Sequence, residues 1–136
     1  VEVRGADAVE PALAKALAAF WKGILYSKES RDWAFDQLRR LTPAERRALM
    51  DAAGREGLGG RAPDGRTLRE ILLGLLDAAS AGLCRQGCCG ESGEDERIWL
   101  TPLRERAASG RSPADEALEA FRRGGGRALA AQLRCA

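Results

Sequence analysis

Apolar residues recur every three or four positions along most of the chain, which is the pattern of amphipathic α-helices. One clear stretch runs from 11 to 26, and its apolar face comprises Leu13, Leu17, Phe20, Trp21, Ile24 and Leu25. A second stretch covers roughly 29–40, and a third begins after Thr42. The strongest stretch follows Thr67, and its predicted buried positions are Leu68, Ile71, Leu72, Leu75, Leu76 and Leu83. The pattern predicts a mainly α chain with about six helices.

Short polar motifs mark the beginnings of several of these helices. Residues 42–45 (TPAE) and 67–70 (TLRE) each place a threonine three positions before a glutamate, as in a capping box. Residues 112–115 (SPAD) repeat this pattern, with a proline at the favoured first helical position. A shorter helix should include residues 98–103, where Pro102 fits only in the first turn. Three tryptophans lie on apolar faces and are expected in the core or in an interface, namely Trp21, Trp33 and Trp99.

Glycine-rich segments separate the predicted helices. Residues 54–66 contain five glycines and a proline, so a loop is expected there. Residues 84–95 contain three glycines and three cysteines, and they should form a loop or a frayed helix end. Three consecutive glycines should end the last full helix and begin a divergent tail over 124–136, which could add a turn or two. The predicted helices therefore fall within residues 9–123.

The first seven residues, VEVRGAD, show a different pattern. Valines at positions 1 and 3 alternate with Glu2 and Arg4, and this alternation predicts a short N-terminal β-strand over residues 1–7. A single strand cannot satisfy its own backbone hydrogen bonds, so it must pair with strands supplied from elsewhere. We therefore expect residues 1–136 to be one helical segment of a larger domain, in which the strand joins a sheet.

Composition and charge exclude several classes of protein. The 136 residues include 22 basic and 20 acidic side chains, and the net charge of +2 is far from the basic excess of a nucleic-acid-binding protein. The longest apolar stretch, 71–83, contains Asp77 and is too short to cross a bilayer. No secretory signal is visible, and four cysteines are few for a secreted disulfide scaffold. We expect a cytoplasmic protein with reduced thiols that binds neither nucleic acid nor membrane.

Seven motifs follow one another along the chain between residue 1 and about residue 121: VEVRGAD, AAFWKGILY, LTPAERRAL, GRTLREI, AGLCRQG, DERIWLTPL and SGRSPADEALEAF. In this order they resemble the C-terminal third of the plant-type glutamate–cysteine ligases of plants and many bacteria. The chain departs from the family pattern at residues 8–10, at Ala19, where proline is usual, and at Lys22, which replaces an apolar residue. Its ending, GGGRALAAQLRCA, also replaces the family's aromatic, glycine-rich ending.

The resemblance implies a fold of the glutamine-synthetase-like superfamily, an α+β domain whose curved antiparallel sheet holds the substrates. It also implies an ATP- and Mg²⁺-dependent ligase that activates the γ-carboxylate of glutamate as an acyl phosphate. The amine of cysteine then displaces phosphate to give γ-glutamylcysteine, in the first step of the synthesis of glutathione or a related thiol. The chain has no histidine and no glycine loop followed by lysine that could cradle a phosphate. We expect it to be inactive alone, without cofactor of its own, and to need the remainder of the catalytic domain as a partner.

Two residues of the opening segment are candidates for binding substrate or phosphate, whereas no catalytic residue is identified. Arg4 could form a bidentate pair with a carboxylate or phosphate group. Glu2 would share the same polar face of the predicted strand. The alternative is that both residues pair with each other or with a neighbouring strand and only hold the sheet together.

The cysteines are candidates for redox chemistry: Cys84, Cys88, Cys89 and Cys135. Plant members of the family that the chain resembles are redox-regulated through disulfides. The spacing of these cysteines does not fit paired zinc knuckles, and no histidine is present, so no metal site is expected. The alternative is that they are free thiols in an exposed segment.

Three hypotheses for the function remain open. The first is the C-terminal part of a glutamate–cysteine ligase. The second is a non-catalytic helical interaction module derived from that family, which binds a partner through an exposed apolar face. The third is a cysteine-based metal or redox module. A preceding sheet rich in glutamate and arginine would favour the ligase over the other two.

Overall fold

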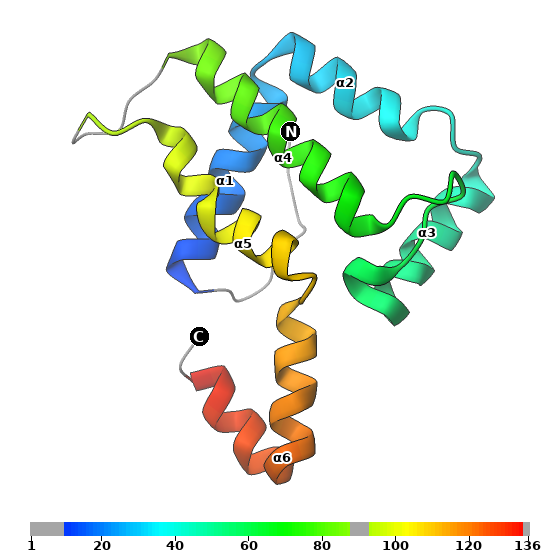
Figure 1. Ribbon diagram of the computed structural model, residues 1–136, viewed down its shortest axis with the longest axis vertical. Coiled ribbons are helices and arrows are strands. Elements are labelled where there is room, and N and C mark those ends of the chain that lie inside the picture. Colours follow the sequence, from blue (N-terminus) through cyan, green and yellow to red (C-terminus); the bar gives the residue numbers. More distant parts are fainter. Residues whose placement is uncertain (1–9, 88–92, 135–136) are drawn as a thin grey trace.

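The computed structural model describes residues 10–87 and 93–134; residues 1–9, 88–92 and 135–136 lie outside the described part. The described residues form six α-helices and two 3₁₀ turns (Figure 1). The helices are α1 (Pro11–Leu25), α2 (Lys28–Leu38), α3 (Pro43–Glu56), α4 (Leu68–Gln86), α5 (Thr101–Ser109) and α6 (Pro113–Arg134). The 3₁₀ turns are η1 (Gly57–Gly59) and η2 (Glu96–Leu100). The mainly helical fold predicted from the sequence is confirmed.

The strand predicted over residues 1–7 lies outside the described residues. Within 10–87 and 93–134 there is no β-strand, and an isolated antiparallel bridge pairs Arg61 with Thr67. The larger sheet implied by the opening segment therefore stays a prediction.

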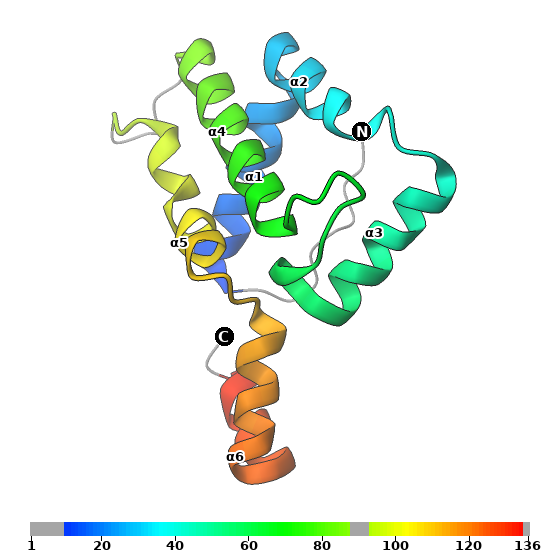
Figure 2. The same ribbon diagram turned by 45° about the vertical axis from the view of Figure 1, so that its right-hand side comes forward.

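The centre of the fold is the crossing of α1 and α4, which lie against each other in both views (Figures 1 and 2). At the crossing, Gly23 of α1 faces Gly82 and Ala79 of α4. A Cβ atom on Gly82 would overlap the carbonyl oxygen of Gly23, and a Cβ atom on Gly23 would lie 2.9 Å from Ala79 Cα. The two backbones touch directly because neither glycine has a side chain. Gly23, which costs α1 some helix propensity, is thus what allows α4 to approach.

A small hydrophobic core surrounds this crossing. It consists of Ala19, Phe20, Ile24, Leu76, Ala79, Leu83, Leu100 and Ala107, which come from α1, α4, η2 and α5. The predicted burial of Leu76 and Phe20 is confirmed, since they are 0% and 7% exposed. Leu72, Leu75 and Trp99 are only partly buried at the edge of the core. Burial is therefore concentrated in the C-terminal half of α4.

Trp21 does not lie in the core, which was one of the two locations predicted for it. Its side chain is 36% exposed, and its ring packs edge-on against the buried Phe20, with 5.2 Å between the ring centroids. Trp33 is 39% exposed, and its ring lies against Gly74 of α4. Both rings cover neighbouring residues at the surface instead of filling the interior, as large aromatic side chains often do.

The three predicted helix starts are confirmed. The hydroxyl of Thr42 accepts from the backbone N–H of Glu45 at 3.3 Å, and the Glu45 carboxylate accepts from the Thr42 N–H at 2.7 Å. Thr67 and Glu70 form the same reciprocal pair at the start of α4. Ser112 and Asp115 do so before α6. These pairs satisfy backbone donors that have no partner within the first turn of a helix.

The predicted loops are shorter than the glycine content suggested. Residues 54–56 belong to α3 and residues 57–59 to η1, so the loop expected over 54–66 begins only at residue 60. Similarly, α4 continues through Gln86, where Gly87 ends it with a positive φ of 62°. Glycine is tolerated within helices when neighbouring contacts favour the helix, which explains the late boundaries.

The α6 helix extends away from the other helices and folds back on itself (Figures 1 and 2). Its backbone leaves the helical conformation at Gly124 and Gly125, where the predicted helix end lies, and resumes beyond them. Ala120 is 1% exposed, whereas Leu118 and Phe121 are about half exposed. The arm formed by α6 therefore presents apolar side chains that the described residues leave partly uncovered.

Replacing Gly82 with alanine should destabilise the fold by about 1–3 kcal/mol, because the new Cβ would overlap the backbone of α1. The matched control is Gly54→Ala. Gly54 lies within α3 with no atom within 4 Å of an added Cβ, so alanine there should stabilise by about 0.5–1 kcal/mol through helix propensity. Urea unfolding of the two variants should shift the midpoint in opposite directions. Equal midpoints for Gly82→Ala and the parent chain would contradict the observed crossing.

Acidification should weaken the start of α4. The Thr67 backbone N–H, and then the Thr67 hydroxyl, stabilise the Glu70 carboxylate and hold its pKa below the ordinary value of 4.5. Since the folded pKa is depressed, the stabilisation is present above pH 4.5 and is lost as the pH falls through the folded pKa. A Glu70 pKa at or above 4.5, measured by NMR titration, would contradict this capping arrangement.

The Thr67→Ala variant provides the second arm of the same test. It removes the hydroxyl that accepts from the Glu70 N–H, and should cost about 1 kcal/mol at neutral pH. The NMR titration should then show the Glu70 pKa closer to its ordinary value.

Candidate functional site

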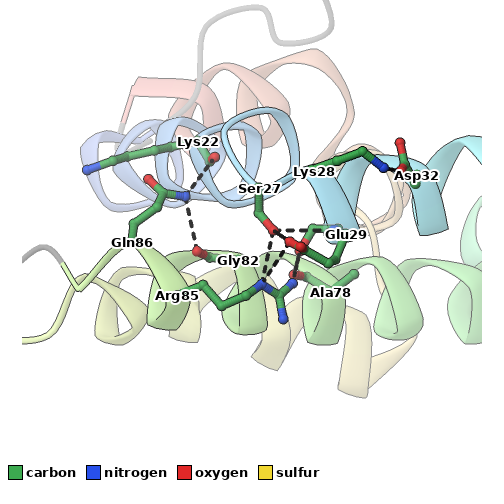
Figure 3. Close-up of polar contacts among 10 residues, drawn as sticks. Lys22, Ser27, Lys28, Glu29, Asp32, Ala78, Gly82, Arg85 and Gln86 are labelled. Carbon is green, nitrogen blue, oxygen red and sulfur yellow. Dashed lines mark hydrogen bonds and ion pairs between the residues drawn. The ribbon is translucent and has the colours of Figure 1, made fainter.

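A cluster of polar side chains joins α2 to the C-terminal half of α4; we call it the serine–arginine cluster (Figure 3). The guanidinium group of Arg85 donates to Ser27 Oγ at 3.1 Å and to Ser30 Oγ at 2.7 Å. The Ser30 hydroxyl in turn donates to the carbonyl oxygen of Ala78 at 2.7 Å. The Glu29 carboxylate lies 3.4 Å from Arg85 Nε. Four side chains thus connect the beginning of α2 with one face of α4.

Local structure explains why these residues meet. Ser27 is the N-cap of α2, and its hydroxyl accepts from the Ser30 backbone N–H. Residues three positions apart share a face of a helix start, so Ser27 and Ser30 both point toward α4. Arg85 lies in the last turn of α4, where a cation also favours the negative end of the helix dipole. The turn between α1 and α2 brings the two elements together.

The electrostatics of the cluster favour an ionised Glu29. Its own backbone N–H, and then the Ser27 hydroxyl at 3.1 Å, donate to the carboxylate and lower its pKa, with a smaller contribution from Arg85. The two serines are almost fully buried, at 5% and 2% exposure, and both have hydrogen-bond partners. The cluster acts as a polar brace between two helices, because its buried hydroxyl groups are already satisfied within the chain.

A shallow pocket of about 390 Å³ lies beside this cluster. Its floor is a row of small residues on α4, Gly74, Ala78 and Ala81, and Trp33 of α2 forms a wall. Asp77 also lines the pocket and pairs with Arg104 of α5 at 2.7 Å. Because its carboxylates already face arginines, the pocket offers mainly a small apolar floor and an aromatic wall.

Two further polar contacts link α1 to the end of α4 and to η2, the two elements on either side of the connection at residues 87–95. The Lys22 ammonium group donates to both oxygens of Glu96, at 2.9 and 2.6 Å, and Glu96 is 9% exposed. The Gln86 side chain donates to the Lys22 carbonyl oxygen at 3.4 Å. Lys22, one of the departures from the family pattern, therefore has a specific partner in η2. The last residue of α4, Gln86, and the first residue of η2, Glu96, therefore both contact Lys22 of α1.

An apolar groove of about 400 Å³ runs along the N-terminal half of α4. It lies between α4, the end of α3, η1 and the residue before α6, and among the described lining residues only Ser112 has a polar side chain. Its lining comprises Ala53, Gly57, Leu58, Leu68, Ile71, Leu72, Leu75 and Ser112. Leucine and isoleucine side chains that the sequence pattern places in the core thus remain partly open in this groove.

The candidate site residues named from the sequence lie mostly outside the described part. This applies to Glu2 and Arg4, and to Cys88, Cys89 and Cys135. Cys84 is described: it lies near the C-terminal end of α4, and its side chain is exposed. The serine–arginine cluster was not anticipated, although the N-cap position of Ser27 was a local signal for part of it.

The described residues do not provide a metal site. Within 10–87 and 93–134, no group of three or more cysteine, aspartate and glutamate side chains is close enough to hold a metal ion. We derive no chemical step through Mg²⁺ or ATP from these residues. In the same described part, no helix has the length and apolar character needed to span a bilayer.

Comparison with known proteins finds relatives over nearly the whole chain. The chain is 33% identical to the chloroplastic glutamate–cysteine ligase of Arabidopsis thaliana over 121 residues, which is 89% of the chain. It is 32% identical to the enzyme of the same name from Nicotiana tabacum over 129 residues, or 95% of the chain. The matched regions make up only 22% and 23% of these relatives, so the chain spans less than a quarter of their length. No solved structure matches the chain.

The family match extends further than the motifs alone. The profile of Glutamate-cysteine ligase family 2 (GCS2) matches residues 1–132, which include the opening segment, all six described helices except the last two residues of α6, and most of the tail. The resemblance seen in the motifs up to about residue 121 therefore continues through the arm. The chain belongs to glutamate–cysteine ligase family 2.

Proposed function

We propose that this chain is the C-terminal helical part of an ATP-dependent ligase that joins the γ-carboxylate of glutamate to the amine of cysteine. The observation that carries the proposal is the family match across residues 1–132. Identity of 33% over 89% of the chain to a plant glutamate–cysteine ligase supports it. The remainder of the catalytic domain, in the same or a separate polypeptide, would be the partner of this segment.

In this proposal the described residues support the site and do not perform the chemistry. ATP, bound with Mg²⁺ elsewhere in the domain, would supply the phosphoryl group that activates the glutamate carboxylate. The crossing of α1 and α4 and the serine–arginine cluster would provide a rigid base next to the sheet. Within this chain, Arg4 and Glu2 would be the residues that reach substrate or phosphate.

A non-catalytic interaction module is the second candidate, and one observation favours it. Several large apolar side chains of the described residues are exposed, among them Phe35 at 65% and Met50 at 75%. Exposed apolar side chains of this kind occur where a partner binds, whether that partner is a ligase sheet or an unrelated protein. The assays below separate the two possibilities.

We expect the 136-residue chain alone to form no γ-glutamylcysteine, since its described residues provide no metal site. The positive arm is a chimera in which this chain replaces the 121 matched residues of the Arabidopsis thaliana relative. The relative truncated by those residues should be inactive, and the chimera should release phosphate from ATP only when glutamate and cysteine are both present. A folded chimera without activity would favour the interaction module, whereas turnover by the isolated chain would contradict our division of roles.

In the active chimera, Arg4→Lys should lower kcat/KM markedly and leave the melting temperature nearly unchanged. Lysine keeps the charge of Arg4 but loses the planar fork that pairs with a carboxylate or phosphate. Steady-state kinetics and thermal unfolding should be measured on the same preparation. If the melting temperature falls while the kinetics are unchanged, Arg4 holds the sheet together and does not contact substrate.

A further inference from the structure

The two halves of α4 differ in how completely they are covered. In the C-terminal half, Ala79, Gly82 and Leu83 are buried against α1. In the N-terminal half, Ile71, Leu72 and Leu75 are only partly buried and line the apolar groove. The buried stripe of an amphipathic helix is normally continuous, so the open half calls for a further apolar contact.

Neither α3 nor α6 closes this groove. No side chain of α3 is buried, and only the end of α3 and η1 border the groove. At the other side, Ser112 precedes α6. The α6 helix extends away from α4 (Figure 2). An aliphatic surface of leucine and isoleucine with a single serine hydroxyl fits an apolar partner much better than a charged one.

Charged side chains connect the residue before α1 with the first turn of α6, which follows the groove residue Ser112. Glu10 is the residue before α1, and its Oε1 atom lies 4.0 Å from Nη2 of Arg106 in α5. The same guanidinium group donates to Glu116 at 2.9 Å, and Glu116 lies one helical turn after Ser112. Arg106 therefore contacts both Glu10, which precedes α1, and Glu116 in the first turn of α6.

We propose that the apolar groove is where the remainder of the ligase polypeptide docks, through an aliphatic face of its sheet. The proposal rests on the proposed function. The choice of occupant follows from length: this segment makes up only 22% of its Arabidopsis thaliana relative, so most of such a polypeptide is available to cover the groove. The strand predicted over residues 1–7 would carry Val1 and Val3 on one face, which is an aliphatic surface of the required kind.

Amide hydrogen exchange tests this docking directly. Exchange in peptides covering η1 and residues 68–75 should be compared between the isolated chain and the chimera with the Arabidopsis thaliana relative. We expect exchange in these peptides to slow by roughly tenfold or more in the chimera, relative to peptides from α1. Unchanged exchange at the groove would overturn the proposal. If exchange at the groove in the isolated chain already slows as the protein concentration rises, a second copy of the chain occupies the groove. That result would also overturn the proposal.

A pair of matched variants checks that the groove itself is responsible. Ile71→Asp places a carboxylate in the groove, and Met50→Asp places the same group on the exposed side of α3. Only Ile71→Asp should abolish the added protection in the chimera, while circular dichroism of each isolated variant verifies that the helices form. Equal protection in both variants would contradict the proposal.

Enzyme activity distinguishes this inference from the proposed function. An inactive chimera with a protected groove would support docking and refute the ligase role of the segment. An active chimera with an unprotected groove would support the ligase role and refute docking at this surface.

Discussion

The direct contact between the backbones of α1 and α4 is the constraint on which the rest of the described structure depends. Gly23 and Gly82 remove the side chains that would otherwise hold the helices apart, and Ala79 extends the same close approach by one turn. This brings Leu76 and Leu83 against Phe20 and Ile24 of α1. Any larger residue at Gly82 would have to separate these groups, so the hydrophobic core depends on two residues that contribute no apolar side chain.

The same crossing explains where the polar contacts form. Because α1 ends beside the C-terminal half of α4, Ser27 and Ser30 come within reach of Arg85, 58 and 55 residues later in the chain. Ser30 Oγ would lie 2.9 Å from a Cβ atom on Gly82, so the serine–arginine cluster also needs glycine at that position. The serine–arginine cluster and the core are therefore parts of one arrangement, which leaves the N-terminal half of α4 only partly covered.

Local sequence patterns predicted the helices and their starts because the responsible interactions lie within four residues. The caps at Thr42, Thr67 and Ser112 depend on such short-range hydrogen bonds. The pattern could not show which part of the apolar stripe on α4 is covered, since Leu72 and Leu76 look alike in sequence. The role of Gly23, the exposure of Trp21 and the pairing of Lys22 with Glu96 depend on contacts between distant segments, or on the absence of such contacts. The site residues named from the opening segment, Glu2 and Arg4, lie outside the described residues and stay predictions.

Our central claim is that this helical segment serves a glutamate–cysteine ligase. The most direct measurement is to express the complete reading frame that encodes this chain and to assay the purified product for γ-glutamylcysteine with ATP, Mg²⁺, glutamate and cysteine. We predict formation of the dipeptide with matching release of phosphate, and loss of both when cysteine is omitted. A folded product that contains a full upstream sheet and forms no dipeptide would contradict the claim.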